Sequence, residues 1–208
     1  MRILSFLMMI TLVVGLVGCG GAQTKDSKDG KEQAKKKNEP AKLEDGKVAL
    51  TSTNTKVEFV GTKEKKAKKH DGGFGDINGE IEYDMEKKAL KSIMVNIMTE
   101  SLYSDDKKLT THLQSNDFFD VKKFPEAKFE STKIETEDED AGQYKVTGKL
   151  TLHGETKEIT FPATVTTKEE EKELKLESEF TIDRTNFGMK YDESKVDNEV
   201  TVKVMVGL

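Results

Sequence analysis

Tryptophan is absent from this sequence, proline is scarce, and the presence of only one cysteine narrows the classes of protein that the sequence can represent. A single cysteine allows no intramolecular disulfide and leaves no cysteine pair for zinc. The histidines, His70, His112 and His153, lack the spacing of a metal site, and neither an HExxH motif nor a GxSxG elbow is present. We therefore expect no catalytic residue, no metal and no cofactor.

Residues 1–18 have the pattern of a bacterial signal peptide. Arg2 precedes an apolar run that ends at Val17, roughly 15 residues long, which is short for a membrane-spanning helix of about 20. The run ends in Leu-Val-Gly-Cys, which resembles the lipobox of bacterial lipoproteins, so we expect lipidation of Cys19 and anchoring to a membrane. Gly20 then favours the outer membrane, where the cell has one. An ordinary signal peptide with an incidental cysteine is the alternative.

Residues 19–44 are predicted to form a disordered, charged linker after the lipidated cysteine. The segment has almost no large apolar side chains with which to offset the entropy cost of ordering. As a flexible tether it would span about 25–30 Å. The net charge is −5, and loss of Arg2 with the signal peptide makes it −5 − 1 = −6. An acidic protein without a basic patch is not expected to bind nucleic acid.

Residues 45–208 contain eight segments in which apolar and polar residues alternate. The segment 143–153 is the clearest, with Tyr144, Val146, Leu150 and Leu152 on one face and polar side chains on the other. Such alternation is typical of antiparallel strands with one face in water. A meander of eight strands buries its apolar faces and removes its edges by closing into a barrel. A two-sheet sandwich is the alternative.

One covering helix is also predicted. In segment 92–100 both faces are apolar, because Met94 and Met98 oppose three aliphatic residues, so we expect the next segment to cover the outside. Segment 104–119 carries Leu109 and Leu113 four residues apart, and Ser104 or Asp105 can cap it. This helix would lie over a wall or the mouth of the barrel.

The motifs "THLQSNDFFDVKKFPEAKFEST", "YKVTGKLTLHGETKEITFP" and "FTIDRTNFGM" closely resemble the YceI-like family, over roughly residues 47–208. The resemblance implies a lipocalin-like, eight-stranded antiparallel barrel in a periplasmic or secreted bacterial protein. It also implies an elongated internal cavity that binds a polyisoprenoid or quinone-like lipid. Two segments depart from the pattern: residues 63–77 are rich in lysine, with a glycine-rich end that we interpret as a loop entering a strand, and the 168–173 turn is highly acidic.

Phenylalanines are concentrated between the helix and the next strand, where Phe118, Phe119, Phe124 and Phe129 lie. We hypothesise that some of these rings line an apolar tunnel; the alternative is that they only attach the helix to the barrel. At most one of the adjacent pair Phe118 and Phe119 is expected to meet a ligand. Gly79 and Gly148 lie on apolar faces, where they mark either space for a lipid or tight bends. Residues proposed to line the cavity are Ile81, Val95, Ile97, Phe119, Phe124, Phe129, Val146, Leu150, Phe180 and Phe187.

Arg184 follows Asp183 in the last motif and has two interpretations. Its guanidinium group could clamp an anionic lipid head group. The favoured alternative is that it bridges to a nearby carboxylate and pins a loop.

The leading functional hypothesis is a non-catalytic envelope lipoprotein that stores or transports an isoprenoid-type lipid in its barrel. Its partners would be that lipid and the membrane that holds Cys19, and a homodimer stays open. The alternatives are an envelope stress or scaffold protein with a filled core and, less favoured, an enzyme acting on a lipid.

Overall fold

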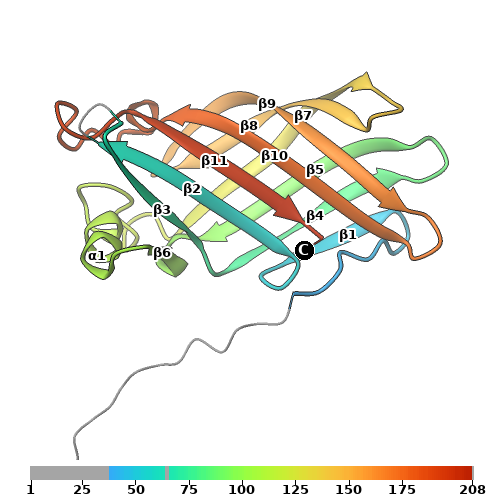
Figure 1. Cartoon of the computed structure of the whole chain (residues 1–208), viewed down its shortest axis with the longest axis horizontal. Coiled ribbons are helices and arrows are strands. Elements are labelled where there is room, and N and C mark those ends of the chain that lie inside the picture. Colours follow the sequence, from blue (N-terminus) through green and yellow to red (C-terminus); the bar gives the residue numbers. More distant parts are fainter. Residues whose placement is uncertain (1–37, 64–65, 208) are drawn as a thin grey trace, which may run out of the picture. The chain divides into compact units, whose positions relative to one another are not determined.

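Antiparallel strands are the main elements of this fold. The computed structural model describes residues 38–63 and 66–207, and over these residues eleven strands form one curled antiparallel sheet accompanied by an α-helix (Figure 1). The strands are β1 Lys47–Thr51, β2 Thr55–Lys63, β3 Lys68–Phe74, β4 Ile77–Asp84, β5 Ala89–Met98, β6 Leu102–Ser104, β7 Glu126–Asp138, β8 Gln143–Leu152, β9 Glu155–Lys168, β10 Glu173–Asp183 and β11 Glu199–Val206. The helix is α1, Lys107–Gln114, and two short 3-10 helices are η1, Thr99–Ser101, and η2, Arg184–Phe187.

The predicted all-β, lipocalin-like class is confirmed, but the predicted number of strands is wrong. The described residues add β1, β3 and β6 to the eight expected strands. Strand β3 includes residues 70–74, the beginning of the glycine-rich stretch that we interpreted as a loop entering a strand. It was missed because its burial pattern has no clean alternation: its first residues are largely exposed and its two adjacent glycines are both buried.

The strand order is β1-β4-β5-β7-β8-β9-β10-β11-β2-β3-β6, and each neighbouring pair is antiparallel. The pairing of β11 with β2 joins the two ends of the domain in register, with Val202 opposite Phe59 and Val204 opposite Val57. Most other neighbours along this order are consecutive hairpins, which matches the predicted meander. The sheet twists and curls so that one face is turned inward (Figure 1).

The two ends of the curled sheet differ in their connections. The β4–β5, β7–β8 and β9–β10 turns lie at the right-hand end in Figure 1, which we call the closed end. Helix α1 and the segment 184–198 between β10 and β11 lie at the left-hand end, which we call the open end. Each end therefore has its own set of covering residues.

The closed end is filled by tightly packed side chains. Leu174, Val146 and Val48 are each 0% exposed, and Tyr144 is 2% exposed. The Tyr144 hydroxyl donates a hydrogen bond to the Lys88 carbonyl (2.7 Å), so its one polar group is satisfied inside the core. Burial of this kind supplies most of the hydrophobic stabilisation of a domain.

Part of the predicted linker belongs to the closed end. Ala41 and Leu43 are buried, and the backbone between them pairs with the start of β10. The Leu43 amide donates to the Lys172 carbonyl (2.8 Å) and the Leu174 amide donates to the Ala41 carbonyl (3.0 Å). The folded domain thus begins before residue 45, because the two apolar side chains Ala41 and Leu43 are buried and the backbone between them pairs with β10. The predicted signal peptide 1–18, Cys19 and most of the linker lie outside the described residues.

Helix α1 lies at the open end and does not cover β5. Met94 on the outer face of β5 is 40% exposed, so the expectation that something covers this face is wrong there. The N-cap is Asp106, one residue after the predicted Asp105 and two after Ser104, and its carboxylate accepts a hydrogen bond from the Leu109 amide (2.9 Å). Within the described part of the chain, no helix has the length and hydropathy that crossing a bilayer requires.

Candidate functional site

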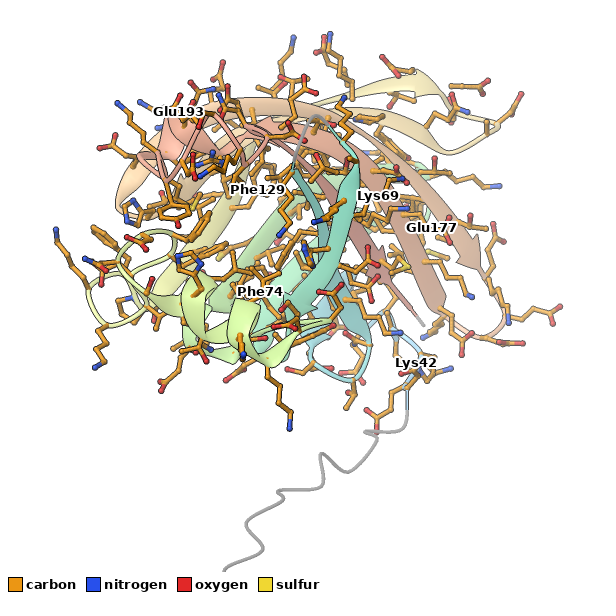
Figure 2. All side chains as sticks on the ribbon, turned by 60° about the vertical axis from the view of Figure 1, so that its left-hand side comes forward. Lys42, Lys69, Phe74, Phe129, Glu177 and Glu193 are labelled. Atoms are coloured by element: carbon orange, nitrogen blue, oxygen red, sulfur yellow. The ribbon has the colours of Figure 1, made fainter. Side chains whose placement is uncertain are left out.

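An apolar cavity of about 530 Å³ lies inside the sheet and reaches the open end, and we call it the lumen. Inward-facing residues of β2, β3, β5 and β7 to β11 form its walls, and α1 contributes Leu109 and Leu113 at the mouth. Figure 2, with the open end turned forward, shows Phe129 within the curl of the sheet and Phe74 beside α1. Ligand pockets are typically about 300–1,000 Å³, so the lumen has the size of a binding site.

Three phenylalanines form an aromatic cluster in the wall of the lumen. The Phe161 and Phe180 rings stack with centroids 4.5 Å apart and planes 12° apart, and the Phe129 ring lies 5.2 Å from Phe161. Ser178 is the polar residue at this depth, and its hydroxyl donates to the Pro162 carbonyl (2.6 Å). This cluster therefore offers an entering ligand a largely apolar surface.

The lumen is elongated. Along β10 its wall includes every second residue from Leu176 to Ile182. Six steps at about 3.3 Å per residue give roughly 20 Å of strand. A chain-shaped apolar molecule fits this dimension better than a compact one does.

Arg184 lies at the mouth and is 3% exposed. Its Nε donates to the Asp197 carbonyl (3.1 Å), and its Nη2 donates to the Val196 carbonyl (2.9 Å). The side chain of Asn198 and the carbonyl of Met189 accept two further hydrogen bonds. Four of the five guanidinium N–H groups are thus used inside the protein. Arg184 pins the segment that follows it, but through carbonyl groups and not through the predicted carboxylate.

The electrostatic environment of Arg184 reflects its burial. Desolvation lowers the pKa of its guanidinium group, and the carboxylates of Glu193 and Asp183 partly oppose this effect. An arginine remains protonated despite such a shift, so the segment is held by a permanent charge.

Three rings join α1 to the segment 184–198 across the mouth. His112 lies edge-on to Phe118 at 5.1 Å and to Tyr191 at 4.8 Å, and the Phe118 and Tyr191 centroids are 5.2 Å apart. His112 is held by Asp117, with 2.9 Å between Nε2 and Oδ2. Edge-to-face pairs of this kind add about 0.5–1.5 kcal/mol each beyond their burial.

Phe118 and Phe119 both line the lumen, and the expectation that at most one of them meets a ligand stays a prediction. They lie in a turn after α1 and not in a strand, and neighbouring side chains in a turn need not point to opposite sides. Phe119 packs edge-on against Phe74 with centroids 5.8 Å apart. Of the predicted lining residues, Val95, Ile97, Phe129, Leu150 and Phe180 also line the lumen.

Four predicted lining residues do not line the lumen. Ile81 and Val146 are at most 1% exposed and lie in the packed core. Phe187 lies in a separate small cluster with Leu152, and Phe124 packs against His153 with centroids 4.5 Å apart. Alternation identified the inward face of each strand but not the level at which the barrel becomes hollow.

The two glycines on apolar faces mark close packing and not space for a lipid. A Cβ at Gly148 would lie 2.5 Å from both the Phe129 ring and the Glu130 carbonyl oxygen. Gly79 has a φ of +155°, and a Cβ there would collide with the Met94 carbonyl. Gly148 thus makes room for the Phe129 ring.

Several lining residues were not singled out from the sequence, among them Phe59, Phe74, Ile93 and Val202. The alternation of β2 and β11 already pointed Phe59 and Val202 inward, so their signal was present. The described residues hold no group of three or more His, Cys, Asp or Glu side chains arranged to bind a metal. The histidines contact single carboxylates or carbonyls instead, as His70 does with Asp105 (3.2 Å) and His153 with the Phe187 carbonyl (3.0 Å).

A curled antiparallel sheet with an apolar lumen open at one end defines a lipocalin-like protein. The YceI-like domain model matches residues 49–208, and the chain belongs to this family.

Similar curated proteins carry the name UPF0312. One from Pseudomonas putida strain W619 is 45% identical over 93 residues, which is 45% of this chain and 47% of that protein. One from Vibrio cholerae serotype O1 strain M66-2 is 40% identical over 119 residues, which is 57% of this chain and 59% of that protein. The matched region thus spans about half the length of these relatives.

Solved structures share the architecture. BcnA of Burkholderia cenocepacia has a TM-score of 0.65 and 27% identity, and the match covers 73% of this chain and 94% of BcnA. The Campylobacter jejuni YCEI protein has a TM-score of 0.60 and 26% identity, covering 66% of this chain and 82% of that one. A polyisoprenoid binding domain from Saccharophagus degradans has a TM-score of 0.50 at 11% identity, covering 78% and 99%, and so supports the fold alone.

Proposed function

We propose that this protein binds an isoprenoid-type lipid, with its hydrocarbon chain inside the lumen and its polar end at the mouth, for storage or transport. The observation that carries this proposal is an elongated apolar cavity of about 530 Å³ that the side chains leave unfilled. Empty apolar space is costly in a folded protein unless a ligand occupies it. The solved domain described as polyisoprenoid binding has the same fold and is consistent with this ligand class.

Binding of this kind requires no reactive group. Burying about 200 Å² of hydrocarbon would contribute roughly 5 kcal/mol at 25 cal/mol per Å². Most residues that line the lumen are aliphatic or aromatic, and the hydroxyl of the lining residue Ser178 already has a partner. We therefore favour a carrier over an enzyme acting on the lipid.

Native mass spectrometry of the freshly purified protein tests the proposal. The expected result is a mass in excess of the polypeptide that disappears on organic extraction, with an isoprenoid lipid in the extract. Repeated recovery of protein without any lipid, which also fails to take up a polyprenyl lipid from vesicles, would contradict the proposal. The filled-core scaffold function would then be favoured.

The proposed location of the protein in the cell rests on its sequence. A lipidated Cys19 would hold the domain at the cell envelope, facing the periplasm, and Gly20 favours the outer membrane. Mass analysis of the N-terminal peptide should show a diacylglyceryl-modified cysteine, and Cys19→Ser should release the protein from membranes. An unmodified Cys19, or a mature chain that begins elsewhere, would contradict anchoring while leaving lipid binding untouched.

A further inference from the structure

Strand β2 carries a niche beside the mouth of the lumen. Alternate residues Val57, Phe59, Gly61 and Lys63 all line the lumen, so the apolar face of this strand ends in a glycine and then a lysine. No atom lies within 4 Å of the position that a Cβ would occupy at Gly61. This contrasts with Gly79 and Gly148, where the same position is filled, and it marks real open space under Lys63.

His70 forms the other wall of the niche. It lies directly opposite Gly61 in the β2–β3 pairing and also lines the lumen. Its Nδ1 lies 3.2 Å from a carboxylate oxygen of Asp105, which orients the ring and leaves Nε2 for another partner. Two nitrogen-bearing side chains therefore flank the open space at Gly61.

Among the described residues that line the mouth, Lys63 is the cation without a charged partner. Arg184 donates to carbonyl groups, and Lys195 lies 3.3 Å from Asp192. Lys66, near the tip of the same hairpin, lies 3.4 Å from Glu199. Within residues 38–63 and 66–207, no carboxylate forms an ion pair with Lys63. An unpaired ammonium at the edge of an apolar cavity favours an anionic partner.

We propose that the niche formed by Gly61, Lys63 and His70 binds an anionic oxygen head group, a phosphate or a carboxylate, of the lipid whose chain lies in the lumen. This inference rests on the proposed function and assigns the head-group contact to Lys63 in place of Arg184. A lysine ammonium binds phosphate as a point charge, and partial exclusion of water at the mouth strengthens the attraction. A neutral alcohol of the same chain length gains no such contact.

The test is a displacement titration with three probes that share one chain: dodecyl phosphate, dodecanoate and dodecanol, each competing with a fluorescent fatty acid analogue. For the wild-type protein we expect both anions to bind at least about tenfold more tightly than the alcohol, as one charge-assisted hydrogen bond provides. Lys63→Gln should reduce this preference to about twofold or less, with little change for dodecanol.

Lys69→Gln is the matched control. Lys69 (labelled in Figure 2) precedes His70 on β3, is exposed and is absent from the lumen wall, so its loss removes the same charge from the same hairpin. We expect Lys69→Gln to keep the preference for anions. A second variant, Gly61→Val, fills the open space and should weaken dodecyl phosphate more than the smaller dodecanoate.

The other possible outcomes would refute either the niche alone or the niche together with the proposed function. Equal affinities for all three probes in the wild-type protein, or a preference that survives Lys63→Gln, would refute the niche while leaving chain binding intact. An equal loss of the preference for anions in Lys69→Gln would show that the hairpin attracts anions through its general positive charge. This result would also refute the niche. Failure of every probe to bind would refute the proposed function together with the niche.

Discussion

The closed and open ends of this barrel are built from the same strands with the same alternation, yet one is solid and the other hollow. Strand β10 shows the contrast within one element: Leu174 at the closed end is 0% exposed, whereas Phe180 and Ile182 toward the open end are only partly buried. The difference arises from what covers each end. At the closed end Ala41 and Leu43 fill the opening, whereas at the open end a helix with no buried residue and a pinned segment surround a mouth.

The alternation of apolar and polar residues thus specifies which face of a strand points into the barrel. It does not specify whether side chains fill the interior at that level. A packed core stabilises the fold at the closed end, and the open end gives up part of that stabilisation to keep space. Stability and binding should therefore respond to mutation at opposite ends of the barrel.

The largest expected effect comes from a matched pair of leucine truncations. Leu174→Ala removes a fully buried side chain and should lower the free energy of unfolding by about 2–5 kcal/mol. Leu150→Ala, whose side chain borders space that is already empty, should cost only about 1 kcal/mol. Urea unfolding of the ligand-free protein measures both. Equal losses would mean that the lumen collapses in solution and would remove the distinction between the two ends.

Arg184→Gln should have the next largest effect, confined to the open end. The substitution removes hydrogen bonds from a buried cation to the carbonyls of Asp197, Val196 and Met189. Loss of these bonds should cost about 2–3 kcal/mol. Hydrogen exchange should accelerate in residues 188–198 and stay unchanged in β8. If Arg184→Gln instead preserves stability but abolishes the preference for anionic lipids, Arg184 and not Lys63 is the head-group residue.

Replacing a valine with phenylalanine should lower lipid affinity at the open end and lower stability at the closed end. Val202→Phe places a ring in the lumen and should reduce lipid affinity at least about tenfold while leaving stability within about 0.5 kcal/mol. Val165→Phe overpacks the closed end and should cost about 1–3 kcal/mol without changing affinity in the protein that remains folded. Lipid titration and urea unfolding of both variants give the four values needed. A large stability loss in Val202→Phe would indicate a filled barrel.

The smallest expected effect is a pH dependence of the closed end. Burial raises the pKa of Tyr83 from 10.0 to about 12. The folded state therefore holds this proton more tightly than the unfolded state, and the stabilisation is complete below pH 10 and is lost as pH rises through 12. Tyr83→Phe should raise the midpoint of alkaline unfolding slightly, whereas Tyr191→Phe, at an exposed ring of the mouth, should not. Identical midpoints for the wild-type protein and Tyr83→Phe would show that burial does not raise the pKa of Tyr83.

The sequence predicted the class of fold because period-two alternation follows directly from strand geometry. The same alternation pointed Val95, Phe129, Leu150 and Phe180 inward, and all four line the lumen. It could not place Ile81, which lies on the same inward face at a level where the core is packed. The level of a residue along the barrel axis depends on the shear of the sheet, the tilt of the strands and the closure of the two ends. None of these produces a local pattern in the sequence.

The errors at the open end have a second cause, which is irregular backbone. Phe118 and Phe119 follow a helix in a turn, so a strand-based rule about adjacent side chains did not apply. Arg184 was interpreted from its residue type, but its partners are backbone carbonyls that no sequence motif reveals. Lys63 continued the inward period of β2, and only the empty space at Gly61 distinguishes it from a surface lysine.

The most direct test of this account is a crystal structure of the protein after saturation with a single polyprenyl lipid. We predict continuous density for a hydrocarbon chain that enters between α1 and the segment 184–198 and contacts the rings of Phe129, Phe161 and Phe180. A lumen closed by rearranged side chains, with the lipid absent or bound to the outer wall, would contradict it.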